Sequence, residues 1–236
     1  SLNSLIKSIK YLKQKLPEIN TRLVILDDHS NSINLEKIKK ISELEKNSEV
    51  ISLDHNIYNS VIVEQKSKET FSNLASLLNS FEVGKDQGED LVFFVEDDYL
   101  HFETMLEEMI SSYQRISSQL GKDIFMCPSD YPYLYMGNEK TNVLIGSKRH
   151  WRTIDKTLCT FLTSKTLINK YWDNFKKNCE NRHDPFEKYL NQIYHKEICI
   201  SPLKSLSIHL TNINSSYGLA PFINYQELWE ENKINH

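Results

Sequence analysis

Three consecutive carboxylates, Glu96, Asp97 and Asp98, directly follow an apolar run at residues 91–95. Like charges packed this closely raise one another's pKa unless a cation compensates them. Mg²⁺ and Mn²⁺ prefer oxygen ligands, and such ions commonly bridge a few carboxylates to substrate phosphates. The cluster therefore predicts a divalent-metal site. The alternative is a solvated loop in which one aspartate caps a helix that begins near Phe102.

A second acidic pair, Asp27 and Asp28, ends another aliphatic run and is followed by His29 and Ser30. Such a run is typical of a buried parallel strand whose carboxyl end opens into a loop. In open parallel sheets, ligands bind outside the carboxyl ends of the strands. We therefore expect this pair to contact a nucleotide base and ribose. The alternative is an ordinary turn, because Asp, His and Ser are common turn residues.

The elements that must position these carboxylates alternate along the first half of the chain. Apolar residues at three- and four-residue spacings predict helices over residues 2–16, 35–46, 68–81 and 102–120. Short apolar runs predict strands at 21–27, 49–54, 91–95 and 123–127. This order predicts an α/β fold with a mostly parallel central sheet flanked by helices, and the 91–95 run suits a central strand covered on both faces.

The second half of the chain is less regular. We expect strands near 142–147 and 158–162, helices at 167–178 and 185–195, and an extended segment from 198 to 209. A chain of 236 residues is long enough for one sizeable domain, so residues 1–127 and 128–236 are interpreted as two parts of a single core.

The composition excludes several classes of protein. The hydrophobic share of 39% and the charged share of 25% are ordinary, and no apolar run is long enough to span a bilayer. The net charge of −4 supplies no basic stripe for nucleic acid. Lysine-rich helical faces at residues 7–15 and 37–40 are interpreted as solvated surface, and peripheral membrane association is the alternative. With no signal peptide in view, we expect a cytoplasmic protein.

Four cysteines, at positions 127, 159, 179 and 199, lie too far apart in the sequence for a zinc knuckle or a redox dithiol. We expect them to be reduced core thiols. Spacing alone does not exclude a disulfide in an oxidising compartment.

The run Leu23-Val-Ile-Leu-Asp-Asp-His-Ser30, followed later by Val92-Phe-Phe-Val-Glu-Asp-Asp98, resembles the GT-A glycosyltransferases, particularly the family 2-like group. The resemblance implies a GT-A fold, with residues 1–127 binding the sugar nucleotide and 128–236 the acceptor. It assigns Asp27, Asp28, Glu96 and Asp97 to the nucleotide donor and Asp98 to Mn²⁺ or Mg²⁺ within the so-called DXD motif. The family's usual first strand would precede Ser1.

The segment Ser201-Pro-Leu-Lys-Ser-Leu-Ser-Ile-His209, followed by residues 215–218, is similar to the closing segment of many such enzymes. In that family the histidine is a metal ligand, so the resemblance assigns His209 to the metal, although an ordinary hydrogen-bonded histidine is the alternative. The family's general base begins a helix after the acceptor region, and Asp184 occupies the matching place, with Glu187 as the alternate. Either acid could instead favour a helix N-terminus.

The basic aromatic stretch at residues 148–152 offers further contacts. Arg149 and Arg152 match phosphate geometry, and the face of Trp151 could stack on a sugar, so all three are candidates for acceptor or diphosphate contact. A surface strand with extended side chains is an equal alternative.

The combined expectation is a metal-dependent, inverting glycosyltransferase that moves a sugar from a nucleotide diphosphate to a glycan or lipid-linked hydroxyl. An inverting mechanism needs a carboxylate to deprotonate the acceptor. The alternative is a non-catalytic protein of the same fold that binds a nucleotide or glycan. A nucleotidyltransferase is disfavoured, because the six glycines of the chain form no phosphate-binding loop.

Overall fold

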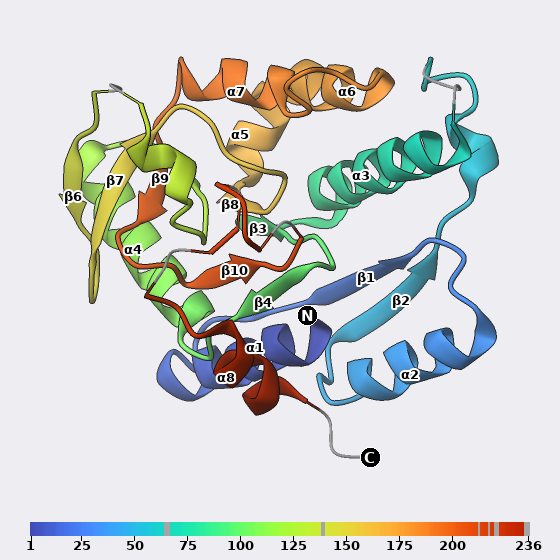
Figure 1. The fold of residues 1–236 in the computed structure, drawn as a ribbon, viewed down its shortest axis with the longest axis horizontal. Helices are drawn as coiled ribbons and strands as arrows, with labels where there is room; N and C mark the ends of the chain where they lie inside the picture. Colours follow the sequence, from blue (N-terminus) through green and yellow to red (C-terminus); the bar gives the residue numbers. More distant parts are fainter. Residues whose placement is uncertain (64–66, 138–139, 212, 217, 220–221, 234–236) are drawn as a thin grey trace.

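The computed structural model describes residues 1–236 except 64–66, 138–139, 212, 217, 220–221 and 234–236 (Figure 1). The helices are α1 (Leu2–Lys15), α2 (Ser32–Ser42), α3 (Lys68–Gln87), α4 (Met105–Leu120), α5 (Lys165–Lys170), α6 (Trp172–Glu180), α7 (Lys188–Tyr194) and α8 (Tyr225–Asn232), with 3₁₀ turns η1 (His55–Tyr58) and η2 (Pro132–Tyr135). The strands are β1 (Leu23–Asp27), β2 (Ser48–Ser52), β3 (Leu91–Phe94), β4 (Tyr99–His101), β5 (Phe125–Met126), β6 (Val143–Ile145), β7 (His150–Ile154), β8 (Phe161–Ser164), β9 (Cys199–Pro202) and β10 (Ser207–His209).

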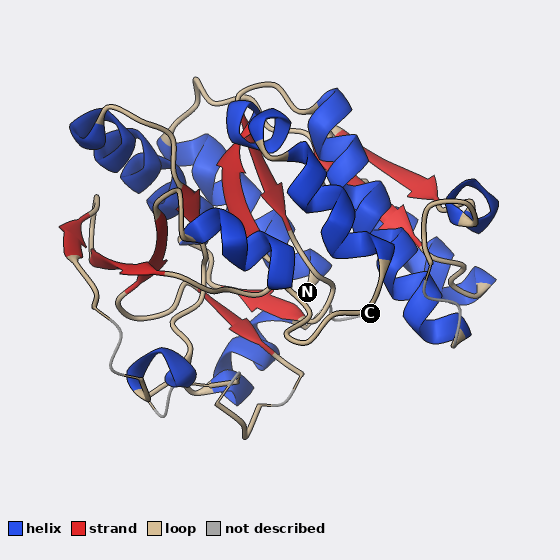
Figure 2. Ribbon diagram, turned by 90° about the horizontal axis from the view of Figure 1, so that it is seen from above, coloured by secondary structure: helices blue, strands red, loops and turns tan. Residues whose placement is uncertain are grey.

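The strands form three hydrogen-bonded groups. A six-stranded sheet has the order β3-β8-β5-β9-β7-β6, β1 pairs with β2, and β4 pairs with β10. Helices α3, α5, α6 and α7 contribute to the hydrophobic core on one side of the large sheet, and α1 and α4 contribute to the core on the other. The perpendicular view shows helices flanking the strands (Figure 2). The α/β class expected from the sequence is confirmed.

The expectation of a mostly parallel sheet is wrong. Within the six-stranded sheet only β5 and β9 are parallel, whereas β3 with β8, β5 with β8, β7 with β9 and β6 with β7 are antiparallel. The physical reason is that β8, from the second half of the chain, inserts between β3 and β5 and runs against both. Strand β3, expected at the centre, therefore lies at the edge of this sheet.

Local sequence features explain where the helices begin and how closely they pack. Helix α3 starts after Ser67, whose side chain accepts a hydrogen bond from the Thr70 amide, as N-cap residues do. Later in the same helix, a Cβ added at Gly84 would lie 2.6 Å from the ring of Phe94 on β3. The absence of a side chain at Gly84 thus allows α3 to lie directly against the strand that leads into the acidic cluster.

An aromatic group forms the centre of the core between α3, α6 and the large sheet. The ring of Phe81 lies 5.0 Å from that of Phe94 and 4.9 Å from that of Phe175, both edge to face, and 6.3 Å from the ring of Phe161.

All four cysteines are buried and free, which confirms the expectation of reduced core thiols. No helix in the described part of the chain has the length and apolar character needed to cross a membrane.

The position of Phe81 predicts a large stability effect. Because its side chain is fully buried among three other rings, Phe81→Ala should lower the free energy of unfolding by about 3–5 kcal/mol in urea denaturation. Phe222→Ala is the matched control, since Phe222 is 61% exposed and its removal should change stability by less than about 0.5 kcal/mol. Equal effects of the two substitutions would contradict this assignment of the core.

Candidate functional site

Two short strands bring the acidic cluster and the C-terminal segment together. Strands β4 and β10 pair antiparallel, with His209 opposite Tyr99, and the Leu210 amide donates a hydrogen bond to the carbonyl of Asp98 at 2.8 Å. Asp98 immediately precedes β4 and His209 ends β10, so this register places both side chains at the same end of the pair. Residues 111 positions apart in the sequence therefore become neighbours.

The carboxylate of Asp98 has one occupied oxygen and one without a partner. Its Oδ2 lies 2.8 Å from His209 Nε2 and accepts a hydrogen bond from Thr211 Oγ1 at 2.6 Å. Its Oδ1 is buried and has no hydrogen-bond partner among the described residues. Burial alone would raise the pKa of Asp98, but the bonds from His209 and Thr211 outweigh it and hold the pKa below its ordinary value. Asp98 is thus charged, with an oxygen still available.

Glu96 lies beside Asp98 in a drier environment. The hydroxyl of Thr160 donates a hydrogen bond to Glu96 Oε2 at 3.1 Å and accepts one from the Glu96 amide at 3.0 Å. Burial, with the neighbouring charges of Asp98 and Glu187, raises the pKa of Glu96 to about 7, against the opposing effects of Thr160 and His209. This carboxyl group therefore exchanges a proton near neutral pH.

Glu187 joins the cluster from a third part of the chain. It is the residue that precedes α7, and its carbonyl accepts the Asn191 amide at 2.8 Å in the first turn. Burial raises its pKa to about 7, while the proximity of His209 opposes the rise. The charges of Glu187 and His209 both act on Glu96, so three carboxylates and one imidazole share one electrostatic environment.

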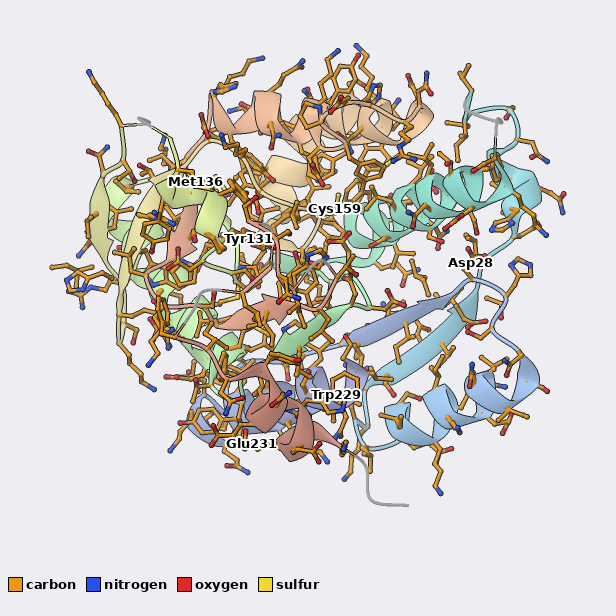
Figure 3. All side chains as sticks on the ribbon, in the orientation of Figure 1. Asp28, Tyr131, Met136, Cys159, Trp229 and Glu231 are labelled. Carbon is orange, nitrogen blue, oxygen red and sulfur yellow. The ribbon has the colours of Figure 1, made fainter. Side chains whose placement is uncertain are left out.

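Buried aromatic residues pack beside the carboxylates and His209. The hydroxyl groups of Tyr99 and Tyr131 hydrogen-bond to each other, and the ring of Tyr99 lies 5.0 Å from that of His209. Cys159, next to Thr160 in the sequence, is also buried. Tyr131 and Cys159 mark the centre of the molecule in Figure 3, whereas Asp28 lies to one side, beneath α3.

Asp98 and His209 fit the metal that the GT-A resemblance implies. A buried carboxylate oxygen without a partner is the kind of ligand that a hard divalent cation takes, and the adjacent imidazole suits Mn²⁺. Two protein ligands leave room for water and phosphate oxygens, as is usual for ions of this class. Asp98 and His209 would hold the ion, with Glu96 and Glu187 next to them.

The other predicted donor residues lie at two places, Asp27 and Asp28 at the end of β1 and Asp97 within the acidic cluster. Asp27 is 5% exposed at the end of β1, and Asp97 is exposed between Glu96 and Asp98. Asp28 is occupied by hydrogen bonds, because its Oδ1 lies 2.9 Å from His29 Nδ1 and its Oδ2 accepts the Ser72 hydroxyl. Among the predicted donor residues, Glu96 interacts electrostatically with both Asp98 and His209.

The two candidates for the general base differ in their surroundings. Asp184 is exposed in the loop that precedes α7, whereas Glu187 is partly buried and interacts electrostatically with Glu96 and His209. Of the two candidates, the structure thus brings Glu187, the alternate, into the electrostatic environment of the acidic cluster. Position 217, within the segment 215–218 that contributed to the resemblance, lies outside the described residues.

The basic aromatic stretch has partners inside the protein. Trp151 on β7 is fully buried, and its indole Nε1 donates a hydrogen bond to Ser112 Oγ at 3.1 Å. Arg152 is 6% exposed, and its guanidinium forms an ion pair with Asp130 at 2.6 Å. Arg149 donates to the carbonyl of Lys204 at 2.6 Å. These contacts position loops and strands, and none of them connects the stretch to the acidic cluster.

Several residues of the site carry no local sequence signal. Thr160 and Thr211 reach Glu96 and Asp98 only through the tertiary fold, so neither is recognisable in advance. His55 is different, because it follows the end of a predicted strand in the same way that Asp28 does. Comparing the carboxyl ends of the two adjacent strands would have brought His55 and Asp28 together.

The raised carboxyl pKa values predict how stability depends on pH. A glutamate with a pKa of 4.5 when unfolded and about 7 when folded binds its proton more tightly in the folded state. Its stabilising contribution to the free energy of unfolding is therefore complete below pH 4.5 and is lost as the pH rises through about 7. Glu96→Gln removes this titration and keeps an acceptor for Thr160, so metal-free wild type should lose stability relative to this variant between about pH 5 and about pH 8.

Urea denaturation across this pH range measures the difference. Glu36→Gln is the control, because Glu36 lies exposed on α2, and its stability curve should run parallel to that of wild type. A Glu96→Gln curve that also runs parallel to wild type would show that Glu96 does not change its affinity for protons on folding.

Comparisons of the sequence with models of known protein families and with curated protein sequences find no match. A function is therefore inferred from the residues and their geometry.

Proposed function

We propose that the protein is a metal-dependent glycosyltransferase that uses a nucleotide-diphosphate sugar as donor. The observation that carries the proposal is the convergence of Glu96, Asp98, Glu187 and His209 from separate segments of the chain. A group of carboxylates with one imidazole and a free buried oxygen supports both metal binding and proton transfer. The resemblance to family 2-like GT-A enzymes likewise assigns the metal to Asp98 and His209 and the donor to Glu96, but it puts Asp184 before Glu187 as the general base.

Asp98 and His209 would hold the ion in this mechanism. A bound Mn²⁺ or Mg²⁺ supplies charge stabilisation on the departing diphosphate. Thr211 contributes by fixing the orientation of Asp98, since its hydroxyl occupies Oδ2 and leaves Oδ1 for the ion. The paired β4 and β10 strands hold these ligands in place before substrate arrives.

Glu187 is our general base. The acceptor hydroxyl attacks the anomeric carbon of the donor sugar and transfers its proton to the Glu187 carboxylate. The bond between the anomeric carbon and the diphosphate oxygen breaks, and the diphosphate leaves with the bonding electrons. A pKa of about 7 suits this step, because general-base catalysis is most effective when the pKa of the base lies near the working pH. Attack opposite the leaving group inverts the anomeric configuration.

The remaining assignments extend the same proposal. Glu96 and Asp97 contact the donor, and the exposure of Asp97 permits this. The acceptor is a glycan or a lipid-linked hydroxyl, which enters beside Glu187. We expect the enzyme to act in the cytoplasm, with peripheral membrane association through its lysine-rich helices where the acceptor is lipid-linked.

A non-catalytic protein with the same site is the second candidate. Its supporting observation is that Asp27 is buried and Asp28 is hydrogen-bonded to protein groups, so neither side chain is open at β1 to the nucleotide donor that transfer requires. Such a protein would bind a nucleotide or glycan without transferring a sugar.

Metal-dependent nucleotide binding is the first test. We expect calorimetric titration with UDP, GDP or CDP to show binding of one nucleotide in the presence of Mn²⁺ and little binding without it. Asp98→Asn should abolish the metal-dependent part, because it replaces a charged ligand with a neutral amide. Glu36→Asn is the matched control on an exposed helical face. Failure of every nucleotide to bind folded wild-type protein would contradict the donor site.

The choice of base provides the second test. Once the donor is identified, Glu187→Gln should lower kcat for sugar transfer by about 10²–10⁴-fold while donor affinity stays near that of wild type, as expected for loss of a general base. Asp184→Asn removes a carboxylate only three positions away that is exposed, so its kcat should remain close to wild type.

The outcomes of this second test separate three cases. A large loss of kcat in Asp184→Asn, with a kcat close to wild type in Glu187→Gln, would identify Asp184 as the base. Donor binding without transfer by wild-type protein, over a broad acceptor panel, would favour the non-catalytic alternative.

A further inference from the structure

A second cluster of metal-binding side chains lies away from the acidic cluster. Asp28 at the tip of β1, the following His29, and His55 in η1 place their ligand atoms within 4.8 Å of one another. Asp28 Oδ1 lies 2.9 Å from His29 Nδ1 and 2.7 Å from His55 Nε2. Figure 3 shows Asp28 beneath α3, separated from Tyr131 and Cys159, which lie near the centre of the molecule.

We propose that Asp28, His29 and His55 bind a transition-metal ion of the zinc class. Two imidazole nitrogens and one carboxylate oxygen form a donor set that favours Zn²⁺ over Mg²⁺ or Ca²⁺, which prefer oxygen ligands. Three protein ligands leave one position of a tetrahedral ion for water or for a substrate group. This site is distinct from the Asp98 and His209 pair and does not rest on glycosyl transfer.

The spacing of the three ligands is close to what such an ion needs. Zinc bonds of about 2.0–2.2 Å in a tetrahedron place neighbouring ligand atoms about 3.3 Å apart. The two histidine nitrogens are now 2.9 and 2.7 Å from the shared carboxylate oxygen. An outward shift of roughly half an ångström in each of these two contacts would bring them to this spacing, and the two histidine nitrogens lie within 4.8 Å of each other. Each ring can stay neutral by carrying its proton on the other nitrogen.

Neighbouring groups already hold the carboxylate and one imidazole in position. Asp28 Oδ2 accepts the hydroxyl of Ser72, and Ser76 Oγ lies 3.3 Å from the same oxygen. The ring of His55 packs edge to face on Phe71, with centroids 5.8 Å apart. Outer contacts of this kind orient metal ligands and are a general feature of metal sites. Helix α3, which carries Ser72, Ser76 and Phe71, therefore supplies the support for this site.

The backbone of His29 provides an independent observation. Its φ angle is 59°, in the left-handed region that favours glycine and is uncommon for other residues. Strained backbone conformations of this kind concentrate at functional sites, where surrounding contacts hold them. In this conformation the His29 ring lies against that of His55, with centroids 4.7 Å apart. The strained conformation thus places the third ligand next to the other two.

Metal binding here would connect three segments at one end of the β1 and β2 pair. The ion would join the loop after β1 to η1, and Asp28 would join both to α3 through Ser72. It would also change the role that the sequence predicts for Asp28, since a metal-bound carboxylate is not free to accept a ribose hydroxyl. A nucleotide in this region would instead reach the open position of the ion.

Zinc affinity of the full chain tests the proposal. A titration against a chromophoric chelator measures Zn²⁺ binding directly, and Co²⁺ in place of Zn²⁺ should give the visible absorption of a tetrahedral site. We expect His55→Ala and Asp28→Asn each to weaken zinc binding more than about 100-fold, since loss of even an outer contact costs about 10–100-fold. Ser72→Ala removes an outer contact of Asp28, so it should weaken zinc binding by only about 10–100-fold.

Matched variants keep the test independent of folding and of the acidic cluster. His29→Asn removes a ligand and retains a residue that tolerates a positive φ, so it should fold and still lose affinity. His195→Ala removes an exposed histidine elsewhere and should leave zinc affinity unchanged. Repeating the titrations in an Asp98→Asn background removes zinc bound at the acidic cluster, so that only the Asp28, His29 and His55 site is measured. Zinc binding to wild type that is no tighter than to folded His29→Asn or His55→Ala would overturn the proposal, whatever the outcome for nucleotides.

Discussion

The candidate site depends on the pairing of β4 with β10. Each strand has only three residues, yet their register is fixed by backbone hydrogen bonds on both sides of His209 and by the burial of Leu100 and Ile208 between the strands and α8. Because strand side chains alternate between faces, a shift of one residue would turn His209 away from Asp98. The contact of His209 with Asp98, the orientation by Thr211 and the Asp98 oxygen that has no partner among the described residues all follow from this single register.

The grouping of carboxylates at this point works against folding stability. Glu96 and Glu187 are placed where burial favours their neutral forms, so each must either hold a proton near neutral pH or have its charge compensated. Asp98 avoids this cost because His209 and Thr211 stabilise its charged form. The site therefore separates one permanently charged acid from two acids whose charge depends on their surroundings. Perturbed pKa values of this kind cluster at functional sites, which supports the proposal of a metal site beside a proton acceptor.

Much of the local structure could be predicted from the sequence, because it depends on short-range patterns. The apolar stripe of α1, the strands that end at Asp27 and before Glu96, and the helix after Ser67 lie within a few residues of their expected positions. The sheet could not be predicted in the same way. Strand direction and neighbour order depend on which distant segments pair, and nothing near residues 161–164 indicates that β8 inserts between β3 and β5.

The predicted site residues differ in how the fold uses their bonding capacity. Arg152 has the chemistry to bind phosphate, but Asp130 pairs with its guanidinium and Tyr135 stacks on it at 3.9 Å, so the charge serves the interior. Asp98 also has strong local partners, and both side chains keep one buried atom without a partner among the described residues, Oδ1 of Asp98 and Nε of Arg152. Only the carboxylate oxygen is an acceptor that a cation could use. Buried polar atoms in folded proteins are almost always hydrogen-bonded, so an unpartnered one requires an explanation. A sequence shows which residue types could bind a ligand, but only the folded arrangement shows which of them retain a free position for one.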